Sequence, residues 1–279
     1  MDPRQLLRQF DIKPKKSLGQ NFLVDEGAAE HIAAAADLTP DDVVLEVGPG
    51  LGALTRCLAG TCARVVAVEL DQRLIPVLQH TLADFPNVEI IHGDVMALQP
   101  SSMLPSAYKV VANIPYYITS ALLRHLLEAD VRPSLMVLTV QEEVARRIVA
   151  RPDDMSLLAV SVQFYGRAEI VSRLKPGAFF PAPKVRSAVV RVDLRSEGQP
   201  ALAVADADLF FRLARAGFGQ RRKQLRNALV SGTEWSRSEV EEALAAAGLD
   251  PRRRAETLTL EEWAALAAAM PAAQVRSVS

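Results

Sequence analysis

The sequence predicts an α/β fold: a doubly wound, mostly parallel seven-stranded sheet, followed by a small all-helical C-terminal domain. Short apolar runs rich in valine and isoleucine alternate with helical patterns such as residues 51–59 and 71–83. Strands that are apolar along their whole length indicate a sheet covered by helices on both faces. The seven expected strands span residues 43–47, 64–68, 88–92, 109–112, 135–140, 168–174 and 187–194.

The end of the chain departs from this alternation. Only the proline-rich FFPAPK segment separates the last two strands, so we expect them to form an antiparallel pair that closes one edge of the sheet. Residues 195–205 then predict a linker, which gives a first domain over residues 1–200 and a second over residues 201–279. Helical patterns in the second domain cover residues 206–217, 221–230, 238–247 and 260–269.

Composition limits the possible classes of protein. The 279 residues are 49% hydrophobic and 23% charged, which is enough to bury a full core. The start, MDPRQLLRQF, lacks the apolar stretch of a signal peptide, and no later apolar run is long enough to cross a membrane. Cys57, Cys62 and the four histidines do not match the spacing of redox or metal sites. We therefore expect a cytoplasmic protein with no metal site and no membrane role.

Basic residues are concentrated late in the chain. From Pro176 onward Lys and Arg outnumber Asp and Glu, whereas the preceding part has an acidic excess. The segment FFRLARAGFGQRRKQLRNAL contains six basic residues and no acidic one. Such a cluster favours binding to a phosphate backbone, although a solvated helix face is the alternative.

A glycine cluster follows the first expected strand, in EVGPGLGALT. Gly48, Gly50 and Gly52 allow the chain to turn sharply and a ligand to approach the backbone where the next helix begins. Glu69 ends the second strand, where its carboxylate can accept hydrogen bonds from two ribose hydroxyls. The pattern predicts a nucleoside site rather than a purely structural turn. It does not exclude NAD, because Gly48, Gly50 and Ala53 also satisfy the loose dinucleotide pattern.

Two later strand ends help to distinguish the cofactors. Asp94 follows the third strand, where it could accept from the exocyclic amine of adenine, and Asn113 ends the fourth. Parallel strands bring all four ends to one crevice. A dehydrogenase would need a His or Lys near its substrate carbonyl, and these strand ends offer none. S-adenosylmethionine fits better, because its methyl group needs only an in-line nucleophile and a site that excludes water.

The NIPYY segment at the end of the fourth strand suggests an adenine as the nucleophile. An adenine N6 amine reacts poorly because its lone pair is delocalised into the ring. Hydrogen-bond acceptors for both N–H groups favour a pyramidal nitrogen, whose lone pair then points at the methyl group. Asn113 Oδ1 and the main-chain carbonyl of Ile114 or Pro115 could be these two acceptors. Pro115 fixes the turn, and Tyr116 can stack on the base. The alternative is that Asn113 and Tyr116 only cap their own turn.

Seven segments in this order together carry a family resemblance, although none is decisive alone. They are KKSLGQNFL (residues 15–23), LEVGPGLGALT, VELD, GDV, NIPYY, FFPAPKVRSAVVRV and FGQRRKQLRNAL. Over almost its whole length the chain resembles the small-subunit (16S) ribosomal RNA adenine N6,N6-dimethyltransferases. The resemblance implies a Rossmann-like class I methyltransferase fold with S-adenosylmethionine as cofactor. It also implies dimethylation of two adjacent adenines near the 3′ end of small-subunit rRNA during ribosome biogenesis.

The resemblance also implies roles for individual residues. Phe179, two residues before the P-x-P element, would sandwich a flipped adenine against Tyr116, with Asn113 as the third catalytic residue; core packing is the alternative for Phe179. The implied cofactor-binding residues are Asn21, Leu23, Gly48, Gly50, Glu69, Asp94 and Asn113. The expected RNA-binding residues are Lys15, Lys16, Arg221, Arg222, Lys223 and Arg226.

The expected partner is small-subunit rRNA within the immature 30S particle, bound by a monomer. Three other interpretations remain open at this point. Methyltransferases of the large-subunit RNA share the N-I/L-P-Y and F-x-P-x-P elements, although GQRRKQLRNAL resembles the small-subunit group more closely. The chain could also be an RNA-binding assembly factor with a vestigial site, or an NAD-dependent dehydrogenase.

Overall fold

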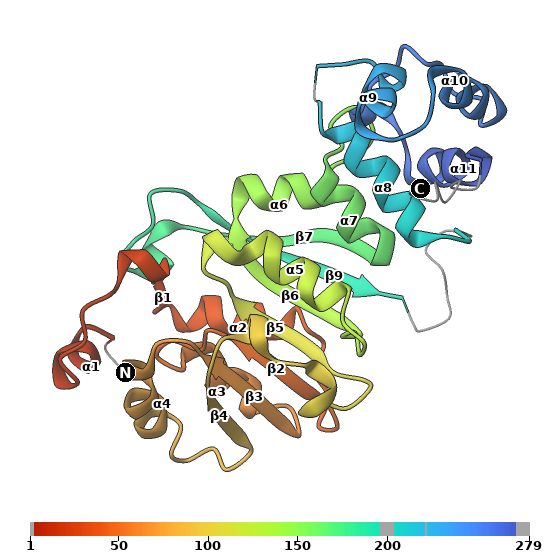
Figure 1. The fold of residues 1–279 in the computed structure, drawn as a ribbon. Coiled ribbons are helices and arrows are strands. Elements are labelled where there is room, and N and C mark those ends of the chain that lie inside the picture. The colour runs from red at the N-terminus through yellow and green to blue at the C-terminus, as the bar shows by residue number, and fades with distance from the viewer. Residues whose placement is uncertain (1–2, 196–203, 221, 272–279) are drawn as a thin grey trace, which may run out of the picture. The chain divides into compact units, whose positions relative to one another are not determined.

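The computed structural model describes residues 3–195, 204–220 and 222–271 (Figure 1). The chain forms two compact units. The sheet unit comprises the described residues of Met1–Arg146 and Gly166–Ser196, and the helical unit those of Arg147–Tyr165 and Glu197–Ser279. The expected domain boundary at residue 200 lies outside the described residues. Residues 147–165, which we expected in the first domain, belong to the helical unit.

The sheet unit contains the predicted seven-stranded, mostly parallel sheet, in the order β4-β3-β2-β5-β6-β9-β7. Its strands are β2 (Val43–Val47), β3 (Arg64–Glu69), β4 (Val88–His92), β5 (Lys109–Asn113), β6 (Leu135–Gln141), β7 (Gly166–Leu174) and β9 (Ser187–Leu194). The five strands from β4 to β6 pair in parallel, and β9 runs antiparallel to β6 and β7. The predicted fold class and the antiparallel pair at one edge are therefore confirmed.

Helices cover both faces of this sheet. On β2, Val44 packs in a cluster with Ile32 and Leu58, whereas its neighbour Leu45 lies on the other face near Leu126. Both residues are buried, which explains why the strand is apolar along its length. The helices of this unit are α1 (Pro3–Gln9), α2 (Glu26–Ala34), α3 (Ala53–Ala59), α4 (Ile75–Thr81), α5 (Thr119–Leu127) and α6 (Glu142–Ile148), which extends into the helical unit.

Several 3-10 helices connect the main elements. They are η1 (Lys16–Leu18), η2 (Gln72–Leu74), η3 (Val95–Ala97), η4 (Pro100–Ser102), η5 (Tyr116–Ile118), η6 (Pro176–Ala178) and, in the helical unit, η7 (Ala255–Thr257). The helices η2 and η3 come directly after β3 and β4, and η1 lies in the N-terminal segment before α2. All three therefore place side chains at the carboxyl edge of the sheet. Asp71 and Asp94 cap η2 and η3 with their side chains.

A second, two-stranded sheet was not predicted. It pairs β1 (Phe22–Leu23) with β8 (Phe179–Phe180) in antiparallel register, so that Leu23 lies opposite Phe179. This pairing ties the N-terminal segment to the segment before the P-x-P element. Phe179 is only 3% exposed and packs in the core of the sheet unit.

The helical unit is built around a cluster of buried side chains. Its helices are α7 (Leu157–Tyr165), α8 (Ala207–Phe218), α9 (Leu225–Gly232), α10 (Arg237–Ala246) and α11 (Leu260–Ala269). Trp263 is fully buried against Gly217, where a Cβ atom would come within 2.5 Å of Trp263 Cη2. No helix among the described ranges of the chain is long and apolar enough to span a bilayer.

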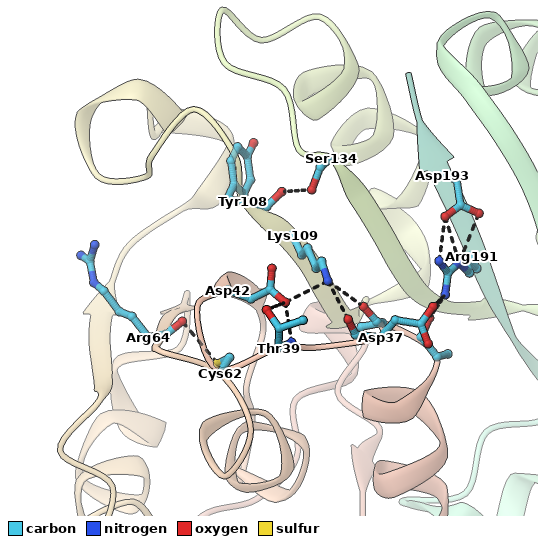
Figure 2. A network of polar contacts seen from close by, with 12 residues as sticks. Asp37, Thr39, Asp42, Cys62, Arg64, Tyr108, Lys109, Ser134, Arg191 and Asp193 are labelled. Atoms are coloured by element: carbon cyan, nitrogen blue, oxygen red, sulfur yellow. Dashed lines mark hydrogen bonds and ion pairs between the residues drawn. The ribbon is translucent and has the colours of Figure 1, made fainter. Parts of the chain in front are cut away.

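A polar network lies at the amino edge of the sheet, where β5 begins (Figure 2). Lys109 Nζ donates to the carbonyls of Ala36 and Asp37 at 3.1 and 2.8 Å and to Asp42 Oδ2 at 2.9 Å. Arg191 Nη1 donates to the carbonyl of Ala35 at 2.8 Å. These cations therefore satisfy carbonyl groups left unpaired beyond the end of α2.

Candidate functional site

A cavity of about 200 Å³ opens at the carboxyl edge of the sheet, opposite the network of Figure 2. The residues that end β2, β3 and β5, together with the loop after β4, line it, and the N-terminal segment covers part of it. We call it the edge cavity. Its lining includes these predicted site residues: Asn21, Leu23, Gly48, Gly50, Glu69, Asp94, Asn113 and Tyr116. Phe179 is not in the lining.

The glycine turn after β2 forms one wall of the edge cavity. Gly48 and Gly50 have φ angles of 70° and 61°, a left-handed conformation that side chains disfavour. A Cβ atom on Gly50 would also approach the ring of Phe22 to 3.0 Å. The N-terminal segment can therefore pack against the turn only because no side chain is present there.

Glu69 is almost fully buried at the end of β3, with 6% of its surface exposed. Its Oε2 accepts from the Gly50 N–H at 3.2 Å, and its Oε1 accepts from the Asp71 N–H at 2.9 Å. Burial raises the pKa of Glu69, and these backbone donors oppose the shift. Each oxygen retains a second lone pair, so the oriented carboxylate can still accept from two hydroxyl groups of a ligand.

Asp94 lies just beyond β4 and is exposed at the edge cavity. Its Oδ1 accepts from the Met96 N–H at 2.9 Å, so this oxygen caps the 3-10 helix η3. The carboxylate is thereby held in place. Its second oxygen remains available to accept from an amine in the cavity.

The amide of Asn113 is oriented by a long-range contact. Its Nδ2 donates to the Asn21 carbonyl at 3.2 Å, which leaves Oδ1 as the free acceptor of the amide. The Pro115 carbonyl accepts from the Ile118 N–H at 3.2 Å, and therefore uses one of its lone pairs within the turn. The sequence analysis named the carbonyls of Ile114 and Pro115 as candidates for the second acceptor of an adenine amine. The Ile114 carbonyl is thus the better candidate.

The ring of Tyr116 is held in place by a hydrogen bond between its hydroxyl group and that of Ser187. Its OH lies 2.8 Å from Oγ of Ser187, which is fully buried at the start of β9. Burial raises the pKa of Tyr116, and the contact with Ser187 opposes this shift. Tyr117 also lines the edge cavity and is 58% exposed, although its role was not predicted from the sequence. Tyr116 therefore offers a fixed ring and Tyr117 an accessible one.

Glu46 is a lining residue that the sequence analysis did not identify. It lies in β2, is 1% exposed, and its Oε2 has no hydrogen-bond partner among the described residues. Burial raises the pKa of Glu46 to about 8, and the nearby Glu69 carboxylate contributes to the shift. A cationic group bound in the cavity would compensate the negative charge of the ionised Glu46 carboxylate. An acidic residue within the apolar strand VVLEV was the available signal.

The predicted RNA-binding residues differ in how much they are engaged by other protein groups. Lys16, Arg222 and Lys223 are exposed, with Lys223 Nζ donating to Ser231 Oγ at 3.3 Å. Arg226 is more buried and donates to Glu241 at 3.1 Å.

Lys15 is exposed but its Nζ lies 3.9 Å from Asp71 Oδ1, so it already has an ionic partner. Arg221 lies outside the described residues. The cations of Lys16 and Arg222 are therefore the most available of the predicted set, and RNA binding by all six residues stays a prediction.

Comparisons with known proteins identify the family to which this chain belongs. The ribosomal RNA adenine dimethylase family matches residues 12–270. A relative from Dehalococcoides mccartyi named "Ribosomal RNA small subunit methyltransferase A" is 48% identical, with 93% of this chain and 89% of the relative covered. A relative of the same name from Moorella thermoacetica is 44% identical, with 94% of each chain covered.

Two solved structures share the fold. The 23S rRNA methyltransferase ErmE is 32% identical with a TM-score of 0.73, covering 90% of this chain and 99% of its own. A dimethyladenosine transferase from Plasmodium falciparum is 24% identical with a TM-score of 0.73, covering 88% of this chain and 95% of its own. Since the family match spans almost all of the sequence, the chain belongs to the ribosomal RNA adenine dimethylase family.

Proposed function

We propose that this methyltransferase places two methyl groups on N6 of each of two adjacent adenines near the 3′ end of small-subunit rRNA. Support for the small subunit comes from the names of the relatives that are 48% and 44% identical, compared with 32% for the 23S enzyme. The family assignment excludes the dehydrogenase interpretation and makes S-adenosylmethionine the methyl donor.

The arrangement of Asn113 supports this chemistry most directly. Its Nδ2 is held by the Asn21 carbonyl, so Oδ1 can accept one N–H of an adenine amine. The Ile114 carbonyl would accept the other. With both protons held, the nitrogen lone pair leaves conjugation with the ring and can attack a methyl carbon. Asn113 Oδ1 and the Ile114 carbonyl would hold the amine protons, which become acidic once the nitrogen is methylated, so the lining residues need not include a strong base.

The lining residues of the edge cavity fit S-adenosylmethionine. Glu69 would accept from the ribose hydroxyls, Asp94 from the adenine amine, and the turn at Gly48 would lie beside the amino-acid end. The orphaned oxygen of Glu46 fits a ligand that carries positive charge. When bound, S-adenosylmethionine supplies an electrophilic methyl group on a sulfonium centre.

The target base needs a flat surface once it leaves the RNA. Tyr116 can provide one because Ser187 fixes its ring, and base–aromatic stacking typically contributes about 1–3 kcal/mol. Phe179 as the opposite surface stays a prediction. Because its ring is buried against the core, that role requires the segment around β8 to shift when RNA binds.

The phosphate backbone of the RNA would be held by the exposed cations Lys16, Arg222 and Lys223. Such contacts position an RNA without reading its sequence. We therefore propose that the shape of rRNA in the immature 30S particle selects the target, and that the enzyme acts there as a cytoplasmic monomer.

Primer extension on both ribosomal RNAs tests the proposed target. Purified protein and S-adenosylmethionine should create a stop at two adjacent adenines near the 3′ end of small-subunit RNA that lacks the modification. Large-subunit RNA should extend normally. Stops confined to large-subunit RNA would assign the enzyme to the other target, and binding to precursor particles with no stops on either RNA would indicate an assembly factor.

A further inference from the structure

Residues 13–21, which we call the strap, cross the edge cavity between two anchored segments. Before the strap, Leu6 and Leu7 pack in a cluster with Leu74 and Val77 of the sheet unit. After it, β1 pairs with β8. The part of the strap from residue 18 to residue 21 lines the cavity directly. Whatever holds the strap therefore determines how easily a ligand can enter or leave.

Asp71 is the carboxylate to which the strap is tied. Gln20 Nε2 donates to Asp71 Oδ2 at 2.8 Å, and Lys15 Nζ lies 3.9 Å from Asp71 Oδ1. Arg73 donates to the Lys13 carbonyl at 3.3 Å and is itself held by Asp71 through Nε and Nη2 at 2.9 and 2.6 Å. Three contacts that hold the strap thus depend on this one side chain.

The Asp71 carboxylate is well suited to hold other groups. It is 5% exposed, and the Arg73 guanidinium lowers the pKa of Asp71 to about 2 despite this burial. The group therefore stays ionised at all physiological pH values. Hydrogen bonds to an ionised acceptor are stronger than those between neutral groups, so the Gln20 contact is a strong one.

Asp71 is also linked to the predicted ribose site. Its main-chain N–H donates to Glu69 Oε1 at 2.9 Å, and the Gly50 N–H holds the other oxygen of Glu69. The same short segment of chain therefore orients the Glu69 carboxylate and ties down the strap. A displacement of this segment would affect both.

We propose that Asp71 is a positioning residue that, through Gln20, holds the strap over the bound S-adenosylmethionine. After methyl transfer, S-adenosylhomocysteine then leaves only when this contact opens. The proposal rests on the edge cavity being the S-adenosylmethionine site, but not on which ribosomal RNA is methylated. Each dimethylated adenine consumes two methyl donors, so this contact must break between transfers. A closed strap would meanwhile keep water away from the transfer.

Asp71→Asn tests the proposal. Both carboxylate oxygens of Asp71 face only hydrogen-bond donors, so the new amide nitrogen is placed against a donor. S-adenosylhomocysteine should dissociate about tenfold faster, as expected for the loss of one hydrogen bond to a charged group. The KM for S-adenosylmethionine should rise more than kcat changes. Hydrogen exchange should accelerate within the strap and remain near wild type in the sheet.

The double variant Asp71→Asn with Gln20→Glu provides a rescue, because it exchanges donor and acceptor at the 2.8 Å contact. It should restore slow dissociation, whereas Gln20→Glu alone should accelerate dissociation by opposing two carboxylates. Asp42→Asn is the matched control: it weakens a carboxylate contact to Lys109 at the opposite edge of the sheet. It should lower stability without changing dissociation.

Unchanged dissociation of S-adenosylhomocysteine from Asp71→Asn, or a double variant as fast as Asp71→Asn, would overturn the proposal. Should Asp71→Asn fail to fold, Gln20→Glu carries the test, because its substitution is on the partly exposed strap. Wild-type protein that does not bind S-adenosylhomocysteine at all would instead contradict the assignment of the cavity itself.

Discussion

The side-chain amide of Asn113 donates to the main-chain carbonyl of Asn21 across 92 positions of sequence, at 3.2 Å. This contact joins the tip of β5 to the N-terminal segment that covers the edge cavity. It also settles the direction of the amide, so that Oδ1 is the atom left for a substrate. In the function that we propose, the same residue would therefore help to enclose the cofactor and would also hold the target amine.

Asn113→Ala should abolish most methyl transfer, because the acceptor that draws the amine lone pair out of conjugation is lost. A loss of about 10²–10³-fold in kcat is typical for removing one oriented polar group at a reaction centre. Methyl incorporation from radiolabelled S-adenosylmethionine measures kcat, and filter binding measures RNA affinity. RNA affinity should stay near wild type; affinity that falls as steeply as the rate would place Asn113 in RNA binding instead.

Glu46→Gln should change how stability depends on pH. The pKa of Glu46 is raised to about 8 in the folded protein, so the folded state favours the protonated carboxyl. The contribution of this proton to stability is fully present below the pKa of the unfolded state and is lost as pH rises toward 8. The loss is about 1.4 kcal/mol per pH unit within this interval. In urea unfolding without ligand, the free energy of unfolding of Glu46→Gln should therefore increase relative to that of wild type between pH 5 and pH 8. An equal difference at both pH values would contradict this.

Gly217→Ala should destabilise the helical unit by about 1–3 kcal/mol, the usual cost of overpacking a core. The added Cβ would lie 2.5 Å from Trp263 Cη2, and the fully buried indole has little room to move. Tryptophan fluorescence during urea unfolding measures the effect. Gly177→Ala is the control, since a Cβ at Gly177 meets nothing within 4 Å. Similar losses in both variants would rule out packing against Trp263 as the cause.

Arg222→Glu should weaken RNA binding and reduce its dependence on salt, because an exposed cation is replaced by an anion. One lost phosphate contact changes the salt slope by about 1. Binding titrations over a range of salt concentrations measure both effects. Arg252→Glu should have a smaller effect, since Arg252 already pairs with Asp250 at 2.9 Å. A salt slope for Arg222→Glu that equals the wild-type slope would remove this residue from the interface.

Much of the sheet could be predicted from sequence because its strands are apolar along their length. The predicted bounds of residues 43–47, 88–92 and 187–194 match β2, β4 and β9. The convergence of Glu69, Asp94 and Asn113 on one cavity follows from the same parallel pairing, since the carboxyl ends of such strands share one edge.

Other features depend on tertiary contacts that leave little local pattern. The two-residue strands β1 and β8 are too short to show a period, so the pairing of Phe179 with Leu23 could not be predicted from the sequence. Residues 147–165 lie between β6 and β7 in the sequence, but Phe164 packs against Phe210 with ring centroids 4.8 Å apart. That packing, between segments far apart in the chain, places them in the helical unit.

The most direct test of the central claim is mass spectrometry of nucleosides from small-subunit RNA before and after incubation with the protein and S-adenosylmethionine. If Asn113 presents adenine amines to the methyl donor, two N6,N6-dimethyladenosines should appear per small-subunit RNA, and in the same time Asn113→Ala should form only a small fraction of them. Dimethyladenosine formed equally well by Asn113→Ala, or methyl groups found only on ring carbons or ribose oxygens, would contradict the account.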